Sequence, residues 1–151
     1  MQELLRVSKE SINKEDSQGR TPLHCGSASG REQVVQELLR VSEESINKED
    51  SQGRTPLHCA SASGREQVVQ ELLRVSEESI NKEASQGRTP LHCGSEKGHA
   101  DVVKVLLRVS DLSVDKVDSK GLTPLGHAVN SNNVALADVL IQGSSLTTIY
   151  R

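Results

Sequence analysis

Hydrophobic and polar residues follow one another in the same order four times along the chain. A polar turn such as "DSQGR" precedes the short apolar segment "TPLHC", a link of small residues and the amphipathic segment "EQVVQELLRV". The glycine of the turn recurs as Gly19, Gly53, Gly87 and Gly121, at a constant interval of 34 residues. Self-similarity with a period of about 20–50 residues is typical of solenoids and other repeat arrays. The pattern therefore predicts one stacked structural unit for each copy.

The first part of each unit predicts a turn and a short helix. Gly19 stands where turns often need a positive φ. Thr21 offers its hydroxyl to the free N–H groups of a helix start, and Pro22 suits the first helical position because its missing N–H costs nothing there. We therefore expect a first helix over "TPLHCGSAS", ended by Gly30.

The second part predicts a longer helix with one apolar face, "EQVVQELLRV". A helix with a single apolar face must pack on its partner helix and on the next unit. The following "SEESINKED" is expected to be an exposed connection, with Ile46 as its apolar anchor. At about 100° per residue, the apolar residues of this helix fall within an arc of about 160°: Val34, Val35, Leu38, Leu39 and Val41.

The interval divides the chain into a leader and four units, which we expect at residues 16–49, 50–83, 84–117 and 118–151. Residues 1–15 are expected to hold only the second helix of a preceding repeat, so that Leu4, Leu5 and Val7 lack their partner helix. Array ends normally need polar caps. The sequence therefore favours a piece of a longer array.

The last unit is degenerate. Gly126 stands where the other units have histidine, and Asn132 replaces the glycine between the helices. Its second helix is expected over "NVALADVLIQ", followed by Gly143, with an outer face that is not strongly polar. By contrast, residues 2–35 and 36–69 differ at only two positions. Such near-identity indicates recent duplication or laboratory construction, and the irregular fourth unit favours duplication in a natural protein.

The order of these residues resembles the ankyrin repeat. The resemblance implies an all-α, ankyrin-type solenoid of stacked helix-turn-helix units joined by hairpin-like loops. The period is 34 instead of the family's usual 33, and the extra residue lies in "RVSEES". We therefore expect the second helix to run slightly long or to end in an irregular turn. The residues of the first unit that carry the resemblance are Gly19, Thr21, Pro22, Leu23, His24, Gly30, Val34, Val35, Leu38, Leu39, Ile46 and Asn47.

Composition restricts the core and the class of partner. Aromatic residues make up 1% of the chain, so the core must be aliphatic. The net charge of −3 comes without the basic stripe that nucleic-acid binding needs. No segment has the length of a signal peptide's apolar region or of a membrane span. We expect an intracellular protein, cytoplasmic or nuclear, without nucleic-acid binding or membrane insertion.

The pairs His24–Cys25, His58–Cys59 and His92–Cys93 invite a metal or nucleophile interpretation, which the repeat geometry opposes. Adjacent helices lie about 8–10 Å apart, whereas zinc ligands converge within about 2.3 Å of one point. We expect the histidines to bond to the threonine hydroxyl or to loop backbone, and the cysteines to make half-buried apolar contacts. An odd number of cysteines fits a reducing compartment. No catalytic residue, metal, cofactor or small-molecule substrate is predicted.

Two serines, Ser42 and Ser76, follow an arginine at the spacing of a basophilic kinase site. The same segment also fits a helix end with solvated serines, which we favour. A phosphate there opposes the helix dipole and loosens the turn.

By the ankyrin resemblance, the variable contact positions flank the turn glycine and end the first helix. Arginines at one-repeat spacing form a ladder that suits carboxylates or a repetitive acidic ligand; alternatively, they are solvated and pair with acids in their own turns. The expected contact residues are Ser17, Gln18, Arg20, Ala28, Ser29, Ser51, Gln52, Arg54, Ala62, Ser63, Ser85, Gln86, Arg88, Glu96, Lys97, Ser119, Lys120 and Leu122.

Three functions fit this organisation. The resemblance implies a non-catalytic protein-interaction module that uses the concave surface of turns and first helices. Identical contact positions in the first two units favour a structural spacer, whereas the divergence of the last two favours recognition. A third alternative is a segment of a larger enzyme, channel or scaffold.

Overall fold

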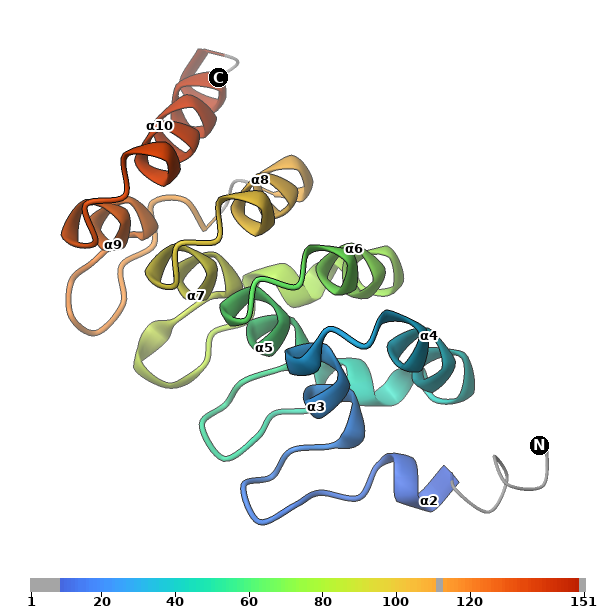
Figure 1. The fold of residues 1–151 in the computed structure, drawn as a ribbon. Helices are drawn as coiled ribbons and strands as arrows, with labels where there is room; N and C mark the ends of the chain where they lie inside the picture. The colour runs from blue at the N-terminus through green and yellow to red at the C-terminus, as the bar shows by residue number, and fades with distance from the viewer. Residues whose placement is uncertain (1–8, 111–112, 150–151) are drawn as a thin grey trace.

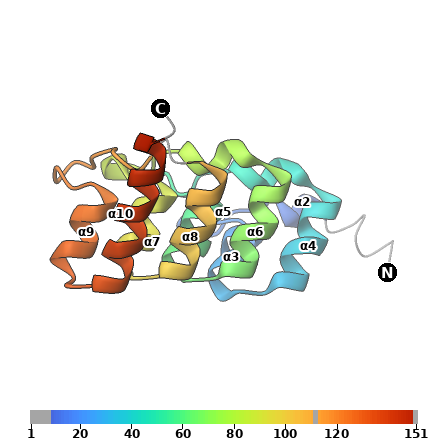
Figure 2. The ribbon, with the colours of Figure 1, turned by 90° about the horizontal axis from the view of Figure 1, so that it is seen from above.

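The helices stack in two rows in the computed structural model, which describes residues 9–110 and 113–149 (Figure 1). The short helix α2 (Lys9–Ile12) lies at one end of the stack, and the rows then advance side by side to the other end (Figure 2). The first row contains α3 (Pro22–Ser29), α5 (Pro56–Ala62), α7 (Pro90–Glu96) and α9 (Pro124–Asn130), and the second contains α4 (Glu32–Val41), α6 (Glu66–Val75), α8 (Ala100–Val109) and α10 (Val134–Ile149).

The predicted signals start and end the first-row helices. Thr21 caps α3, since its hydroxyl accepts from the backbone N–H of His24, and Pro22 occupies the first turn. Gly30 ends the helix with a φ of 72°, in the left-handed region that a residue with a Cβ rarely adopts. Thr55, Thr89 and Thr123 cap the other helices of this row in the same way. The expected first helix is therefore confirmed.

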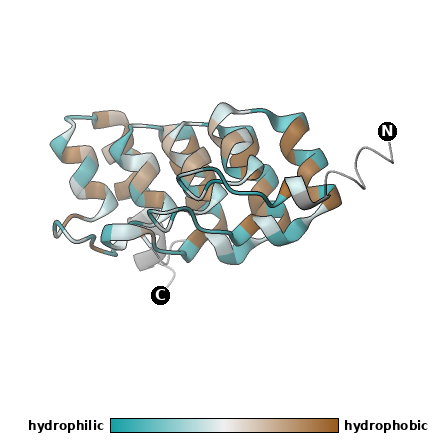
Figure 3. Cartoon of the chain, turned by 90° about the horizontal axis from the view of Figure 1, so that it is seen from below, coloured by the Kyte–Doolittle hydropathy of each residue, from teal (hydrophilic) through white to brown (hydrophobic). Residues whose placement is uncertain are grey.

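Aliphatic side chains between the rows form the core, and the turns are largely hydrophilic (Figure 3). Val35 and Leu39 of α4 are buried as expected, but Val34 is 51% exposed, so its assignment to the buried face was wrong. Its equivalents Val68 and Val102 are each 1% exposed. The reason is stacking: α4 covers α6 and α6 covers α8, whereas no described helix of the second row precedes α4.

A 3₁₀-helix follows α4 and α6, so the expected irregular turn is confirmed: η1 (Glu43–Asn47) and η2 (Glu77–Asn81). The expectation of an exposed connection with solvated serines was wrong in part. Ile46 is buried, as expected of the apolar anchor, but Ser42 and Ser45 are buried as well, while the glutamates between the two serines face solvent. At Ser45 the reason is a hydrogen bond between units, because the Ser45 hydroxyl donates to the Asn13 side chain and Ser79 repeats this contact with Asn47 at 2.5 Å.

The last unit departs from the others, as its sequence indicated. Asn132 has a φ of 54° and replaces the glycine between α9 and α10. Helix α10 continues beyond Gly143, where a helix end was expected, because Gly143 does not adopt the left-handed conformation that ends α3. On its outer side Val134 and Ile141 are 76% and 49% exposed, in agreement with an outer face that is not strongly polar.

The all-α solenoid is thus confirmed for the described residues, whose only β-type pairing is an isolated bridge between Ala84 and Arg88. None of the described helices is long and apolar enough to cross a membrane. The expected helix of the preceding repeat, with Leu4, Leu5 and Val7, lies outside the described residues.

Candidate functional site

The turns that join successive units are hydrogen-bonded to one another in a row. The backbone N–H of Ser51 donates to the carbonyl oxygen of Gln18 at 2.9 Å, and Ser85 donates to Gln52 at the same distance. Ser119 continues the row by donating to Gln86 at 2.8 Å. These bonds hold the turns in register, so the turns follow one another in a row beside the first-row helices (Figure 1).

An aspartate organises each of the first two turns. Asp50 Oδ1 accepts from the backbone N–H groups of Gln52 and Arg54, both at 2.9 Å, while its Oδ2 accepts from Arg54 Nε at 3.0 Å. Asp16 makes the same bonds, with Arg20 Nε at 3.1 Å. Burial raises the pKa of Asp50, but the hydrogen bonds from Arg54 and Gln52 and the charge of Arg54 outweigh it, so the pKa is lowered. The expectation that some arginines pair with acids in their own turns is confirmed.

The third turn has no such carboxylate, because Ala84 occupies the position of Asp16 and Asp50. Gln86 adopts a φ of 68°, and the turn forms a short 3₁₀-helix, η3 (Ser85–Gly87). Arg88 pairs instead with Glu96 near the end of α7, with 2.7 Å between Nη2 and Oε2. Its Nε is buried and has no hydrogen-bond partner among the described residues.

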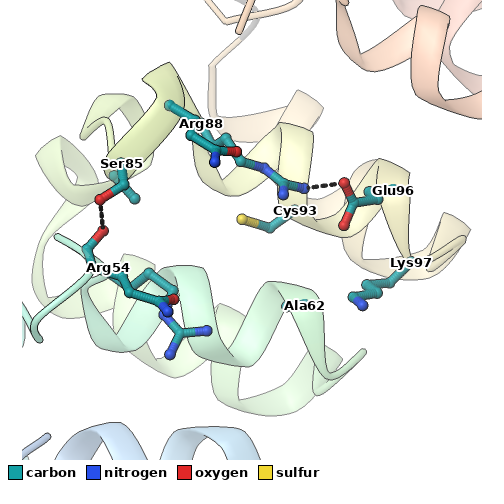
Figure 4. A pocket seen from close by; sticks show the side chains of 10 residues that line it. Arg54, Ala62, Ser85, Arg88, Cys93, Glu96 and Lys97 are labelled. Carbon is teal, nitrogen blue, oxygen red and sulfur yellow. Dashed lines mark hydrogen bonds and ion pairs between the residues drawn. The ribbon is translucent and has the colours of Figure 1, made fainter. Parts of the chain in front are cut away.

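A pocket of about 360 Å³ lies between the second and third units (Figure 4). Arg54, Arg88 and Lys97 surround the Cys93 side chain, and the Ser85 hydroxyl donates to the carbonyl oxygen of Gln52 at 2.7 Å. Burial raises the pKa of the Cys93 thiol to about 11, so it is neutral near pH 7. The lining consists of Gln52, Arg54, Ala62, Ala84, Ser85, Gln86, Arg88, Cys93, Glu96 and Lys97.

The histidines at the start of the first three first-row helices, His24, His58 and His92, form hydrogen bonds to the turns. Each accepts from the backbone N–H of its threonine through Nδ1, as expected. Each also donates through Nε2 to loop backbone, as expected, although the sequence did not indicate that the carbonyl belongs to the following turn. The bonds run from His24 to Arg54 at 2.8 Å, from His58 to Arg88 at 2.9 Å and from His92 to Leu122 at 3.1 Å. Burial lowers the pKa of His58 to about 4. The ring is therefore neutral near pH 7.

His127 is a second feature that sequence reasoning missed. It takes the cysteine position of the fourth unit, and its Nε2 lies 2.7 Å from Asp118 Oδ2. Its ring meets that of His92 edge-on, with 5.9 Å between centroids. Burial acts to raise the pKa of Asp118, but the hydrogen bonds from Leu122, His127 and Lys120 outweigh burial. The pKa of Asp118 is therefore lowered to about 2. The signal in the sequence was the shift of histidine by one position beside Gly126.

The expected contact residues are all at least partly accessible, on the turns and at the ends of first-row helices. The pocket brings together the expected contact residues of the second and third units, except Ser51 and Ser63, which lie outside its lining. The contact residues of the first and fourth units do not line it. Sequence reasoning missed Ala84 and Cys93, although the loss of the periodic aspartate at Ala84 was visible.

The three cysteines are free; Cys59 and Cys93 are buried, whereas Cys25 is exposed instead of half-buried because no described helix covers that side of α3. No three potential metal ligands gather in the part of the chain that the structure describes.

Comparison with known families agrees with this architecture. A family model described as ankyrin repeats, in three copies, matches residues 1–84 and 74–149. No curated protein matches the chain in sequence.

Proposed function

Because the chain belongs to the ankyrin-repeat family, whose repeats are generally protein-protein interaction modules, we propose that it binds another protein through the surface formed by its turns and first-row helices. The repeats in this proposal span residues 16–49, 50–83, 84–117 and 118–151. The partner contacts the accessible side chains that flank each turn glycine and those that end each first-row helix. The chain itself carries out no catalysis. Free cysteines support an intracellular location, cytoplasmic or nuclear.

One observation carries the proposal most strongly. Eight of the ten residues that line the pocket between the second and third units are expected contact residues, and the other two are Ala84 and Cys93. Repeat proteins use extended concave surfaces of this kind to bind their partners. The hydrogen-bonded row of turns supports this function further, because a site that is already ordered loses less conformational entropy when it binds.

A structural spacer is the second candidate, and the first two turns favour it. Arg20 and Arg54 are each neutralised by an aspartate of their own turn, and their contact positions are identical. These units therefore offer a partner little that distinguishes one from the other. The third turn, with Ala84 in place of the aspartate, breaks this uniformity and favours recognition.

Photo-crosslinking distinguishes the two candidates. A photoreactive amino acid replaces Gln52 in the second turn. In a matched variant it replaces Gln70, an exposed residue of α6 in the second row of helices. The protein-interaction proposal predicts a covalent partner for the Gln52 variant and none for the Gln70 variant. The captured protein is then produced recombinantly, and its binding to the unmodified chain is measured by calorimetry. Capture at neither position, or at Gln70 alone, contradicts the proposal and favours the spacer.

A further inference from the structure

We propose that the pocket between the second and third units binds the carboxylate of an acidic peptide segment in a partner protein, and that Arg88 is its main anchor. The inference rests on the proposed function, since it names the chemistry of the ligand at that surface. Its basis is a comparison among three equivalent turns, one of which lacks the carboxylate that the others contain.

The first two turns supply their own acceptor for the arginine. Asp50 Oδ2 lies 3.0 Å from Arg54 Nε, and Asp16 Oδ2 lies 3.1 Å from Arg20 Nε. Ala84 has no carboxylate, and the equivalent nitrogen of Arg88 is buried without an acceptor among the described residues. A buried donor without an acceptor costs free energy, and more so when the group is charged. A carboxylate oxygen from a partner removes this cost.

The position that the missing carboxylate leaves borders the pocket, because Ala84 itself lines the pocket together with Arg88. Since Arg88 Nε is buried, the Arg88 side chain must turn towards the pocket before a partner carboxylate reaches this nitrogen. The third turn also has a different backbone from its neighbours, with the non-glycine residue Gln86 at a φ of 68°. Such a conformation is uncommon for residues with a side chain. A partner carboxylate beside Arg88 Nε takes the place that Asp50 Oδ2 holds in the second turn.

The charges in the pocket favour an anion. Three cations and one carboxylate line it, which amounts to a net charge of +2. Asp50 pairs with Arg54 from outside the lining and reduces this excess to +1. Glu96 engages Nη2 of Arg88 and not Nε, so the incoming carboxylate need not displace it. Arg54 and Lys97 offset the repulsion from Glu96 (Figure 4).

An NMR titration tests the proposal directly. The ¹⁵N-labelled full chain is titrated at low ionic strength with a capped hexaglutamate peptide and, as the matched control, with a capped hexaglutamine peptide. We expect hexaglutamate alone to shift the Arg88 Nε–H signal and the backbone amide signals of the third turn. The shifts should weaken as salt is added, because salt screens the charges. Equal shifts with hexaglutamine, or hexaglutamate shifts spread evenly over the first three turns, would overturn the proposal.

The substitution Ala84→Asp supplies the missing carboxylate from within the chain. The variant is expected to fold, because aspartate already occupies the equivalent positions 16 and 50. We expect it to shift the Arg88 Nε–H signal without peptide and to weaken hexaglutamate binding by about tenfold, since a hydrogen bond to a charged group is lost to the peptide. Ala84→Asn, which has the same size without the charge, should bind more tightly than Ala84→Asp. Equal affinity of Ala84→Asp and the native chain, or of the two variants, contradicts the proposal.

The two proposals fail in different ways. Capture of a partner at Gln52 without hexaglutamate binding refutes the carboxylate site and leaves the interaction function intact. Hexaglutamate binding at Arg88 without capture at Gln52 refutes the interaction function and leaves the carboxylate site intact. The pocket then recognises carboxylates, but the row of turns does not hold a protein.

Discussion

The imidazole Nε2 of His24 donates a hydrogen bond of 2.8 Å to the backbone carbonyl oxygen of Arg54 in the following turn. On the other side of the ring, Nδ1 accepts from the backbone N–H of Thr21 at 3.1 Å. A carbonyl oxygen only accepts and a backbone N–H only donates, so Nε2 carries a proton and Nδ1 serves as the acceptor. One side chain thus links the start of a helix to the turn of the next unit.

Replacement of His58 by alanine is expected to destabilise the fold. The change leaves the carbonyl of Arg88 and the N–H of Thr55 without their partner at a buried site. We expect a loss of about 2–4 kcal/mol in the free energy of unfolding, measured by urea titration followed by circular dichroism. The helix itself should persist, because α9 begins after Thr123 with Gly126 at the histidine position. A loss below about 0.5 kcal/mol, the size of an ordinary surface effect, would show that the link between units contributes little.

Stability should fall as the pH is lowered from about 6.5 towards about 4. Burial lowers the pKa of His58 to about 4, whereas in the unfolded chain the imidazole protonates near 6.5. Between these values the unfolded state binds more protons, so the stabilisation is complete above the upper value and is lost as the pH falls. One such histidine contributes a slope of at most about 1.4 kcal/mol per pH unit. Urea unfolding at several pH values measures the slope, which should decrease in the His58→Ala variant; an unchanged slope excludes His58 as its origin.

Replacement of Gly26 by alanine is expected to stabilise the chain. Gly26 is buried inside α3, and an added Cβ meets Val35 Cγ2 at 3.5 Å, an ordinary van der Waals distance. Ala60 already occupies the equivalent position of α5. Alanine is favoured over glycine in a helix interior by about 1 kcal/mol, so we expect a gain of up to about that size in urea unfolding. A destabilised variant would mean that the core beside α3 has no room for a methyl group.

The matched control is Gly30→Ala, four residues later. Gly30 has a φ of 72°, and an added Cβ lies 2.7 Å from Arg65 Cδ. Arg65 Nε also donates to the carbonyl oxygen of Ala28 at 3.1 Å, so displacement of its side chain disturbs the contact between units. We expect a loss of about 1–2 kcal/mol, opposite in sign to the effect at Gly26.

The three cysteines should react at different rates with a thiol reagent. Burial raises the pKa of Cys59 and Cys93 to about 11, whereas Cys25 is exposed. The thiolate is the reactive form, and a rise of about two pKa units lowers its fraction about 100-fold near pH 8. Mass spectrometry of the partly labelled native chain should find the label first on Cys25. Labelling of Cys59 or Cys93 at the same rate, without urea, would contradict their burial.

Local signals in the sequence were sufficient for the helices and their order. Thr21, Pro22 and Gly30 act on their own neighbours in the chain, so their effect does not depend on the rest of the fold. Gly143 shows the limit of such signals. A glycine ends a helix only where the backbone turns left-handed, and at Gly143 it does not.

Burial depended on stacking and was predicted less well. Val34 and Val68 have the same local sequence, yet one is 51% exposed and the other 1%. Ser45 lies in a polar segment, but it is buried where its hydroxyl bonds to Asn13 of the preceding unit. The periodicity of one helix states which face is apolar but not whether a neighbour covers it.

The sequence by itself determined the period, the order of the helices, the aliphatic core and the family, because these follow from local residue preferences and from repetition. Only the tertiary structure decided how the units are connected and where their side chains meet. It placed the histidine of one unit on the turn of the next, and it gave Arg88 a carboxylate from α7 in place of the aspartate that its own turn lacks. Both contacts join residues whose approach is set by the packing of one repeat on another, and no local preference along the chain specifies that packing.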